Sequence, residues 1–364
     1  MKELILSPGL KGELVDSPMP LPGPNELLIR VVVAAVNPKD WKASEQLGLT
    51  SNPADDMSGI VEAVGSEVFE FKQGDRVAAL HQPFTPHGTF AEFSLAPADT
   101  AFKISDSTGF EEAAAIPLAA MTAGLALHRR LGLPAPWDMA ANESGTSARG
   151  PVLIYGAGAA VGAYAVQLAV RARLHPIIAI AGGSKEYVQT IIDPSQGDVV
   201  LDYRQGPDAV VAQAKEALGG KALYHAFDCI SSNGSDNFVG RIIHAHEPEK
   251  CKVAVVVPRS LSEVSFVQVP DDLPLDPMRG IPEDVTVMWT NLGSVFETEN
   301  DFGYIFFRYM GKGIAEGWLK AVPQTIVPGG LDGVSQALRD IKDGVHSATK
   351  YVVRIGDAAK SGQK

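Results

Sequence analysis

The sequence predicts an α/β protein with two domains, the second of which contains a doubly wound parallel sheet. Three observations predict this class. The chain has 364 residues, 45% of them hydrophobic, which is enough for two separate cores. The first hundred residues consist mainly of short apolar segments separated by Gly, Pro and Asp, as in β-rich domains. From residue 151 onwards, apolar strand segments alternate with helical segments, and this alternation is typical of a parallel sheet covered by helices.

The β-rich part is predicted from a series of short strands. Residues 26–36, ELLIRVVVAAV, are rich in Val and Ile and follow the turn sequence LPGPN, which predicts a buried strand. Further strands are predicted at residues 58–65, 74–80 and 88–96, where apolar segments are bounded by Gly, Asp or Pro.

A helical segment is predicted next, at residues 105–132. It begins with Ser and Thr, has acidic residues in its first turn and ends with Arg129 and Arg130, a pattern that favours a helix. Pro117 is expected to break or kink this helix. The polar stretch at 133–150 is expected to be a long surface loop that leads into the second domain.

The second domain is predicted from five apolar segments with helices between most of them. These predicted strands lie at residues 152–156, 176–182, 198–203, 224–230 and 251–257. After residue 293 the pattern gives a helix at 301–318, a strand at 322–328, a helix at 329–344 and a strand at 349–355. This last part either extends the parallel sheet or returns to the first domain.

Composition and charge exclude several classes of function. With 31 Lys and Arg against 43 Asp and Glu the net charge is −12, so we expect no nucleic-acid partner and no anionic membrane surface. Two cysteines, Cys229 and Cys251, cannot build a four-cysteine zinc site or an iron–sulfur cluster. The uncharged run at 152–170 contains three glycines and is better explained as strand, turn and helix than as a membrane span. The apolar stretch near the N-terminus is too short for a signal-peptide core, and we expect a cytoplasmic protein.

The strongest local motif is a glycine turn between a predicted strand and a predicted helix. Gly156, Gly158 and Gly162 stand in the sequence YGAGAAVGAY, where small residues let a backbone approach a pyrophosphate at a helix N-terminus. The context favours a dinucleotide site, although the spacing is GxGxxxG rather than GxGxxG. The alternative is a turn in which glycine serves packing only. The residues expected to contact the cofactor here are Gly156, Gly158, Ala159, Ala160 and Val161.

The end of the next predicted strand indicates which cofactor. NAD-binding folds place an acidic residue there to hold the ribose hydroxyls, whereas this chain has Gly182, Gly183, Ser184 and Lys185. A hydroxyl and an ammonium suit a 2′-phosphate, so NADPH is the expected cofactor. The alternative is that Lys185 is an ordinary surface lysine in the first turn of a helix.

Seven segments in sequence order carry a family resemblance over nearly the whole chain. The chain resembles the medium-chain dehydrogenase/reductase superfamily, on its zinc-free quinone-reductase and enoyl-reductase side. The sequence LGLPAP followed by a polar loop is similar to fungal trans-acting polyketide enoyl reductases and ToxD-like proteins. The segments that carry the resemblance are VNPKDWK, SGIVEAVGSEVFEFKQGDRVA, HGTFAEF, EEAAAIPLAAMTAGLAL, VLIYGAGAAVGAYAVQLA, VVLDYR and TKYVVRI.

The resemblance implies a GroES-like β-rich catalytic domain and a Rossmann NADP-binding domain, with the active site in the cleft. The first would comprise residues 1–119 and 300–364, and the second residues 120–299. Zinc-dependent relatives place a Cys where this chain has Pro38 or Lys39, and a His-Glu pair where it has Asp55 and Asp56. We therefore expect no metal. Some related enoyl reductases use a Tyr as proton donor, but no Tyr lies between Trp41 and Leu80.

The resemblance also implies a reaction and two catalytic candidates. Zinc-free members transfer hydride from NADPH to the β-carbon of a double bond conjugated to a carbonyl, and the protein must stabilise the resulting enolate. Lys42 resembles a lysine near the nicotinamide in polyketide enoyl reductases, where it could bind a ribose, stabilise the enolate or donate a proton; the alternative is a surface lysine. Thr122 resembles a threonine that faces the nicotinamide or substrate, and its alternative is a helix Thr bonded to its own turn. Asn37 and Asp40 are expected to organise their loop.

Further cofactor contacts are carried over from the resemblance. Tyr203 matches a position that packs on the adenosine 2′-phosphate, and its alternative is a core Tyr at a strand end. The remaining expected contacts are Lys39, Asp40, Val256, Val257, His346 and Ser347. Cys229 is expected to be a small buried residue.

Three functions stay open at this point. The leading one is an NADPH-dependent enoyl reductase that acts on a carrier-bound substrate, with a polyketide synthase as partner. A reductase of small quinones or enones and a non-catalytic NADP-binding protein are the alternatives. An acidic carrier protein would need a local basic patch, for which Lys39, Lys42, Arg129 and Arg130 are the nearby candidates.

Overall fold

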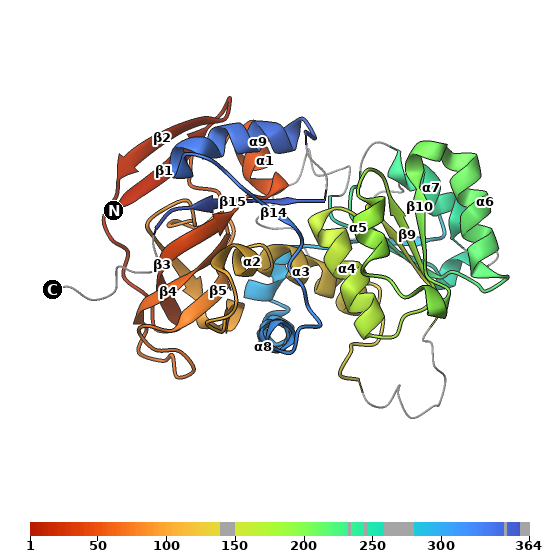
Figure 1. Cartoon of the computed structure of the whole chain (residues 1–364), viewed down its shortest axis with the longest axis horizontal. Coiled ribbons are helices and arrows are strands. Elements are labelled where there is room, and N and C mark those ends of the chain that lie inside the picture. Colours follow the sequence, from red (N-terminus) through yellow and green to blue (C-terminus); the bar gives the residue numbers. More distant parts are fainter. Residues whose placement is uncertain (139–149, 232–233, 244–246, 258–279, 346–347, 357–364) are drawn as a thin grey trace. The chain divides into compact units, whose positions relative to one another are not determined.

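The computed structural model describes residues 1–138, 150–231, 234–243, 247–257, 280–345 and 348–356. The chain divides into two compact units (Figure 1). Unit 1 comprises Met1–Met121 together with Gly293–Lys364, and unit 2 comprises Thr122–Leu292. The domain boundaries at 119/120 and 299/300 that the family resemblance implies stay predictions.

Unit 1 is built around a mixed sheet of seven strands beside a two-stranded hairpin. Along the sheet the order is β14-β15-β3-β4-β5-β7, and β6 also pairs with β3. The hairpin strands pair antiparallel, with Lys2 opposite Asp16. The strands are β1 (Lys2–Ser7), β2 (Lys11–Asp16), β3 (Glu26–Ala35), β4 (Asp56–Val64), β5 (Arg76–Leu80), β6 (Phe93–Pro97), β7 (Ala101–Lys103), β14 (Gln324–Ile326) and β15 (Lys350–Arg354).

Strand β3 is the centre of this sheet, because it pairs with β4, β6 and β15. Eight of its ten residues are buried, and these eight are all Val, Ile, Leu or Ala, whereas Glu26 and Arg30 are half-buried. Val352 in β15 lies opposite Ala35 in an antiparallel pair. The last part of the described chain therefore belongs to the sheet of unit 1.

Helix α1 (Pro38–Glu45) directly follows β3 and was not expected from the sequence. Pro38 occupies its first turn, and Asn37 and Asp40 form a capping box at its N-terminus, which is a strong helix start. The segment is only eight residues long and strongly polar, so it lacks the apolar periodicity that identifies longer helices.

The predicted helix at 105–132 is divided in the structure. Helix α2 (Phe110–Ala114) ends before Pro117, and α3 (Pro117–Gly124) begins at it, as expected from the missing N–H of proline. A π-helical turn, Leu125–Arg130, continues α3. This turn belongs to unit 2. Further helical segments of unit 1 are α8 (Asn300–Glu316), α9 (Val334–Lys342) and the short helices at Ala98–Thr100 and Gly330–Gly333, and a short helix at Leu292–Phe296 lies at the boundary of the two units.

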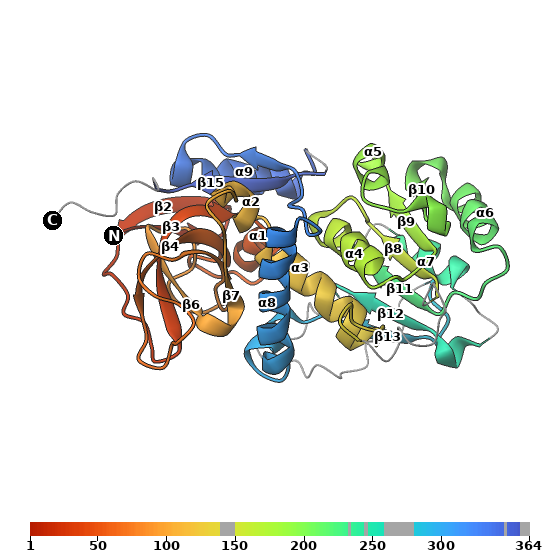
Figure 2. The same ribbon diagram turned by 60° about the horizontal axis from the view of Figure 1, so that its bottom comes forward.

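Unit 2 contains a parallel sheet in the order β10-β9-β8-β11-β12-β13 (Figure 2). From the middle of the sheet, β8, β9 and β10 follow one another in one direction, and β11, β12 and β13 follow one another in the other direction. The direction in which the sheet grows therefore reverses between β8 and β11. In open parallel sheets, ligands bind at the carboxyl ends of the strands at such a reversal. The strands are β8 (Val152–Tyr155), β9 (Ile177–Ala181), β10 (Val199–Asp202), β11 (His225–Asp228), β12 (Lys252–Val255) and β13 (Thr286–Trp289).

Helices α4 (Ala160–Arg171), α5 (Lys185–Gln189), α6 (Pro207–Leu218) and α7 (Ser235–Ile242) connect these strands. The uncharged run at 152–170 is thus a strand, a turn and the helix α4, as the glycines indicate. Within the described part of the chain, no helix combines the length and apolar character that a membrane span requires. The predicted loop at 133–150 lies mostly outside the described residues.

Candidate active site

The glycine turn of unit 2 brings backbone and side chains into very close contact. It links the end of β8 to the N-terminus of α4, and Gly156 has a φ of +77°, a left-handed conformation that favours glycine. A Cβ on Gly158 would lie 1.6 Å from Ser184 Oγ, and one on Gly162 would lie 2.2 Å from the carbonyl oxygen of Gly156. A larger residue at Gly158 would displace Ser184, and one at Gly162 would push the start of α4 away from the backbone of the turn, so glycine serves packing at both positions.

The same turn presents the start of a twelve-residue helix. Helix α4 begins at Ala160 with Ala159 as its N-cap, and no side chain caps its first N–H groups. Such N–H groups and the helix dipole suit a pyrophosphate. The residues of the turn thus fit a dinucleotide, while the cofactor contacts of Ala159, Ala160 and Val161 stay predictions.

Three residues expected at the 2′-phosphate come from the ends of two neighbouring strands, β9 and β10, which pair in parallel. A Cβ on Gly182 would lie 2.5 Å from Cε1 of Tyr203, so the glycine makes room for the tyrosine ring. Tyr203 is 45% exposed, which disfavours the alternative of a core tyrosine. Ser184 is buried against Gly158, and Lys185 is the partly exposed first residue of α5. Gly183 is exposed beside them.

An ion pair at the end of β10 was not predicted from the sequence. Asp202 accepts hydrogen bonds from Arg204 Nε at 2.9 Å and Nη2 at 2.6 Å. Arg204, with a smaller contribution from Lys185, lowers the pKa of Asp202 to about 2. The pairing offsets a carboxylate charge that would otherwise repel a phosphate beside Tyr203. In the sequence, the signal that could have indicated this ion pair is the pattern Asp-x-Arg at positions 202–204.

The ends of β11 and β12 are tied together by Asp228 and Ser231. Asp228 is buried and accepts hydrogen bonds from the N–H groups of Ile230 and Ser231. Ser231 Oγ in turn accepts from the N–H groups of Val256 at 3.1 Å and Val257 at 3.3 Å. These two N–H groups are thus already engaged, which leaves the side chains for the predicted cofactor contact.

Cys229 is buried in the same region, as expected, and burial raises the pKa of its thiol well above the usual value. It is therefore a poor nucleophile. His346 and Ser347, also predicted as cofactor contacts, lie outside the described residues.

In unit 1, Asn37 organises the start of α1. Its side chain donates to Asp56 Oδ2 at 2.9 Å, and Lys350 Nζ donates to the same oxygen at 3.0 Å. The N–H of Leu118 donates to Asp56 Oδ1 at 2.7 Å. These bonds connect α1, β4, β15 and α3 through buried groups, which supports the organising role expected for Asn37.

The ammonium of Lys42, unlike that of Lys39, forms no salt bridge with another described residue. Lys42 lies in α1, partly buried, with its ammonium 5.7 Å from the centre of the Trp41 ring. No hydrogen bond or ion pair to another described residue is formed by its ammonium, and burial lowers its pKa. A partly desolvated cation without a counter-ion is well suited to an anionic partner. Thr122, the second catalytic candidate, is 6% exposed in α3.

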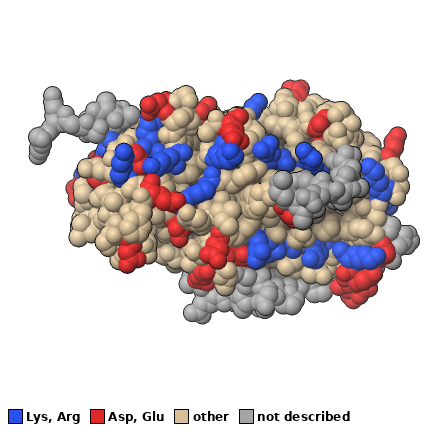
Figure 3. Space-filling model, turned by 90° about the horizontal axis from the view of Figure 1, so that it is seen from below, with Lys and Arg blue, Asp and Glu red and all other residues tan. Residues whose placement is uncertain are grey.

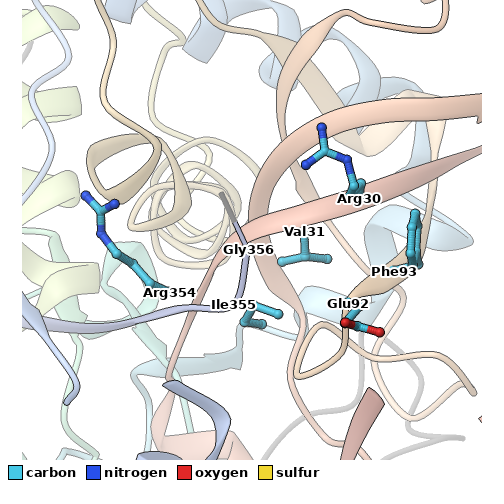
Figure 4. Close-up of a pocket in the computed structure, with 7 residues that line it drawn as sticks. All are labelled: Arg30, Val31, Glu92, Phe93, Arg354, Ile355 and Gly356. Carbon is cyan, nitrogen blue, oxygen red and sulfur yellow. The ribbon is translucent and has the colours of Figure 1, made fainter. Parts of the chain in front are cut away.

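Unit 1 also contains a pocket of about 280 Å³ that includes none of the predicted site residues (Figure 4). Arg354, on its wall, is paired with Glu111. Among the described residues, no group of three or more His, Cys, Asp or Glu side chains is arranged to hold a metal ion. The pocket is lined by Arg30, Val31, Glu92, Phe93, Arg354, Ile355 and Gly356.

Comparison with known proteins extends these observations to the whole chain. Residues 23–106 match the alcohol dehydrogenase GroES-like domain. The trans-enoyl reductase fsr4 of Gibberella fujikuroi is 40% identical over 92% of both chains. The enoyl reductase component lovC of lovastatin nonaketide synthase from Aspergillus terreus is 29% identical over 93% of this chain and 92% of its own. An alcohol dehydrogenase superfamily protein from Novosphingobium aromaticivorans shares the fold, with a TM-score of 0.73, 20% identity and coverage of 98% and 100%.

The GroES-like sheet of unit 1 and the Rossmann sheet of unit 2 define a medium-chain oxidoreductase that uses a nicotinamide cofactor. Within the medium-chain dehydrogenase/reductase superfamily, the chain belongs to the family of enoyl reductases represented by these fungal relatives.

Proposed function

We propose that this protein uses NADPH to reduce a carbon–carbon double bond conjugated to a carbonyl, in a substrate carried as a thioester during polyketide synthesis. The observation that carries the proposal is the partly buried ammonium of Lys42, which has no ion-pair partner among the described residues, in a chain related over almost its full length to a trans-enoyl reductase. Because the family consists of oxidoreductases, the non-catalytic alternative is not retained.

The cofactor is proposed to be NADPH because of the groups at the ends of β9 and β10. Ser184, Lys185 and Tyr203 offer a hydroxyl, an ammonium and an exposed aromatic ring, and β9 ends without the acidic residue that selects NAD. The N-terminus of α4 would hold the pyrophosphate. When bound, NADPH supplies the hydride for the β-carbon of the substrate.

Lys42 is proposed to stabilise the negative charge that develops on the carbonyl oxygen. Its ammonium is partly removed from water, and no carboxylate of the described residues forms an ion pair with it, so its interaction with an enolate is stronger than that of an exposed lysine. Thr122 is proposed to position the reacting groups, because its buried place in α3 fixes its side chain.

The substrate is proposed to arrive on a synthase, because the Aspergillus terreus relative is named as the enoyl reductase component of lovastatin nonaketide synthase. Two of the four basic residues expected to form a patch for an acidic carrier are engaged within the protein. Arg130 is buried and donates to the carbonyl of Trp289 at 3.1 Å, and Lys39 is paired with Asp55. On the face shown in Figure 3, basic and acidic side chains are interspersed. Arg129, which is exposed, is kept as a candidate contact for a carrier.

The proposal is tested by measuring oxidation of NADPH and NADH with three acceptors: a crotonyl pantetheine thioester, a small enone and a quinone. We expect turnover of the thioester with NADPH. Turnover of the quinone or the small enone alone would instead assign the protein to reduction of small free substrates. Oxidation of neither cofactor with any acceptor would overturn the proposed reaction.

A further inference from the structure

A buried cluster of charged side chains lies around the start of α1 in unit 1. It contains three carboxyl groups, on Asp40, Asp55 and Asp56, each at most 1% exposed. It also contains two ammonium groups: that of Lys350, which is buried, and that of Lys39, whose side chain is 23% exposed. The described part of the cluster therefore holds one more acid than it holds cations.

Asp56 and Lys350 form a complete pair within this cluster. Asp56 accepts hydrogen bonds from Lys350, Asn37 and the N–H of Leu118. Lys350 also donates to the side-chain oxygen of Asn37. Asp56 thus accepts three hydrogen bonds, and its ion pair with Lys350 matches one acidic group with one basic group.

Lys39 is left to balance two carboxyl groups. Its ammonium lies 2.5 Å from Asp55 Oδ2 and 3.8 Å from Asp40 Oδ1. Asp40 Oδ1 and both carboxylate oxygens of Asp55 are buried without a hydrogen-bond partner among the described residues, so Lys39 and Asp55 are joined as an ion pair. Two ionised carboxylates in this position would leave one buried negative charge uncompensated, which is costly. The pair therefore retains one proton at neutral pH.

The titration behaviour of the two acids agrees with this charge balance. Burial, opposed by Lys39 and reinforced by Asp55, raises the pKa of Asp40 to about 8. Burial likewise raises the pKa of Asp55, against the influence of Lys39 and His81. His81 faces this pair from the end of β5, and its ring nitrogens contact Leu95 O at 2.7 Å and Thr85 Oγ1 at 3.1 Å.

Lys39 is the member of the cluster that reaches the surface. Its ammonium also donates to the carbonyl of Pro53 at 2.5 Å and lies 5.0 Å from the ring centre of Phe84. Phe84 is 37% exposed. Lys39 stands three residues before Lys42 on α1, a spacing that places the two side chains on neighbouring parts of the helix surface.

We propose that Lys39 donates the proton that completes the reduction, and that the Asp40–Asp55 pair, which stores one proton, restores it. The proposal rests on the function proposed above and supplies its missing proton donor. It also gives a reason for a lysine at position 39 beyond the predicted cofactor contact.

After the hydride has reached the β-carbon, the electron pair of the double bond is delocalised between the α-carbon and the carbonyl oxygen. An N–H bond of Lys39 breaks and a C–H bond forms at the α-carbon. The neutral amine takes the stored proton from the carboxyl pair, of which Asp55 lies nearer to it, at 2.5 Å, and Asp40 farther, at 3.8 Å. Water then returns a proton to the pair.

The delivery step is tested by running the reaction in D₂O with NADPH and the crotonyl thioester. The wild-type product should carry deuterium on one face of the α-carbon. The variant Lys39→Met should be slowed about 10²-fold or more and should lose facial selectivity, because solvent then supplies the proton. Lys39→Arg is the sharpest comparison, because it keeps the charge and the pairing with Asp55 but not a transferable proton.

We expect Lys39→Arg to behave like Lys39→Met, and the surface variant Lys11→Gln to behave like the wild type. Recovery of rate and selectivity by Lys39→Arg would show that only the charge is needed and would overturn the proposal. Retention of both properties by Lys39→Met would do the same. Thermal unfolding of each variant establishes that a loss of activity does not come from misfolding.

A second measurement requires neither cofactor nor substrate. NMR of protein with ¹³C-labelled aspartate carboxyls should reveal one proton released with a midpoint near pH 8, and Asp40→Asn should abolish this step. Absence of the step in the wild type would overturn the stored proton. Absence of any NADPH oxidation by the wild type would instead refute the proposed function, and with it the delivery step, so the two failures are distinguishable.

Discussion

Lys42 and Lys39 share one short helix, but their surroundings give them different chemistry. Lys39 is held by Asp55 and the carbonyl of Pro53, whereas the ammonium of Lys42 lies over the Trp41 ring and forms no hydrogen bond or ion pair with another described residue. The sequence identifies both as candidates by resemblance. It could not reveal the pairing of Lys39 with Asp55, because that contact joins α1 to the residue before β4 across sixteen positions of chain.

Replacement of Lys42 tests its proposed role at the enolate. Lys42→Met keeps the packing on Trp41 but removes the charge, and we expect turnover of the thioester to fall about 10²-fold with little change in NADPH affinity. Lys342→Met is a matched control, because Lys342 lies at the same distance, 5.7 Å, from the centre of the Trp41 ring. Equal turnover for Lys42→Met and the wild type in steady-state kinetics would contradict the assignment.

The raised pKa of Asp40 predicts how the free energy of unfolding depends on pH, and this prediction can be tested without an activity assay. The folded-state pKa of Asp40, about 8, exceeds the unfolded value of about 4, so between these pH values the folded protein holds a proton that the unfolded chain releases. The free energy of unfolding contributed by this group therefore falls as pH rises through this window, by at most about 1.4 kcal/mol per pH unit.

Urea unfolding from pH 5 to 8 checks this sign. The wild type should lose stability relative to Asp40→Asn, which cannot ionise at this position. If the difference between the two proteins stays constant over the window, Asp40 does not carry the stored proton.

At the scale of elements, the turn between β8 and α4 was the clearest feature in the sequence. Its glycines, apolar strand and uncharged helix define the local fold almost without long-range information. Helix α1 and strand β13 were missed for the opposite reason: α1 is short and polar, and β13 follows a long stretch with no regular periodicity. The α2–α3 break at Pro117 was predictable because proline removes a backbone donor.

The packing of the glycine turn gives a direct test. Gly158→Ala would place a methyl group 1.6 Å from Ser184 Oγ, so Ser184 must move from its place beside Lys185. We expect at least tenfold weaker NADPH binding in a fluorescence titration. Gly109→Ala is a steric control, because a Cβ there lies no closer than 3.7 Å to its neighbours. Unchanged NADPH affinity in Gly158→Ala would contradict the proposed site.

We propose that residues at the end of β9 determine the preference for NADPH over NADH. Lys185→Ala should weaken NADPH binding about 10- to 100-fold, the loss expected for one charge-assisted contact, and should leave NADH affinity nearly unchanged. Parallel titration with both cofactors measures this difference. An equal loss for NADPH and NADH would assign Lys185 a general role rather than one at the 2′-phosphate.

At the scale of the whole molecule, the order of strands and helices in unit 2 was largely predictable from periodicity. Periodicity alone did not predict which chain segments form unit 1, because the register that joins β15 to β3 depends on tertiary contacts between distant parts of the chain. The same limit applies to the site. Candidate cofactor residues that follow strands could be proposed from the sequence and stay predictions, whereas the charge balance among Asp40, Asp55 and Lys39 required the folded arrangement.

The central claim is that this chain is an NADPH-dependent enoyl reductase. The most direct measurement uses NADPH deuterated at the transferred C4 position, NADH deuterated in the same way, and the crotonyl pantetheine thioester, with the product examined by NMR. The account predicts a saturated thioester with one deuterium on the β-carbon, formed with NADPH in strong preference to NADH. Recovery of the unsaturated thioester, or of a product reduced at the carbonyl, would contradict it.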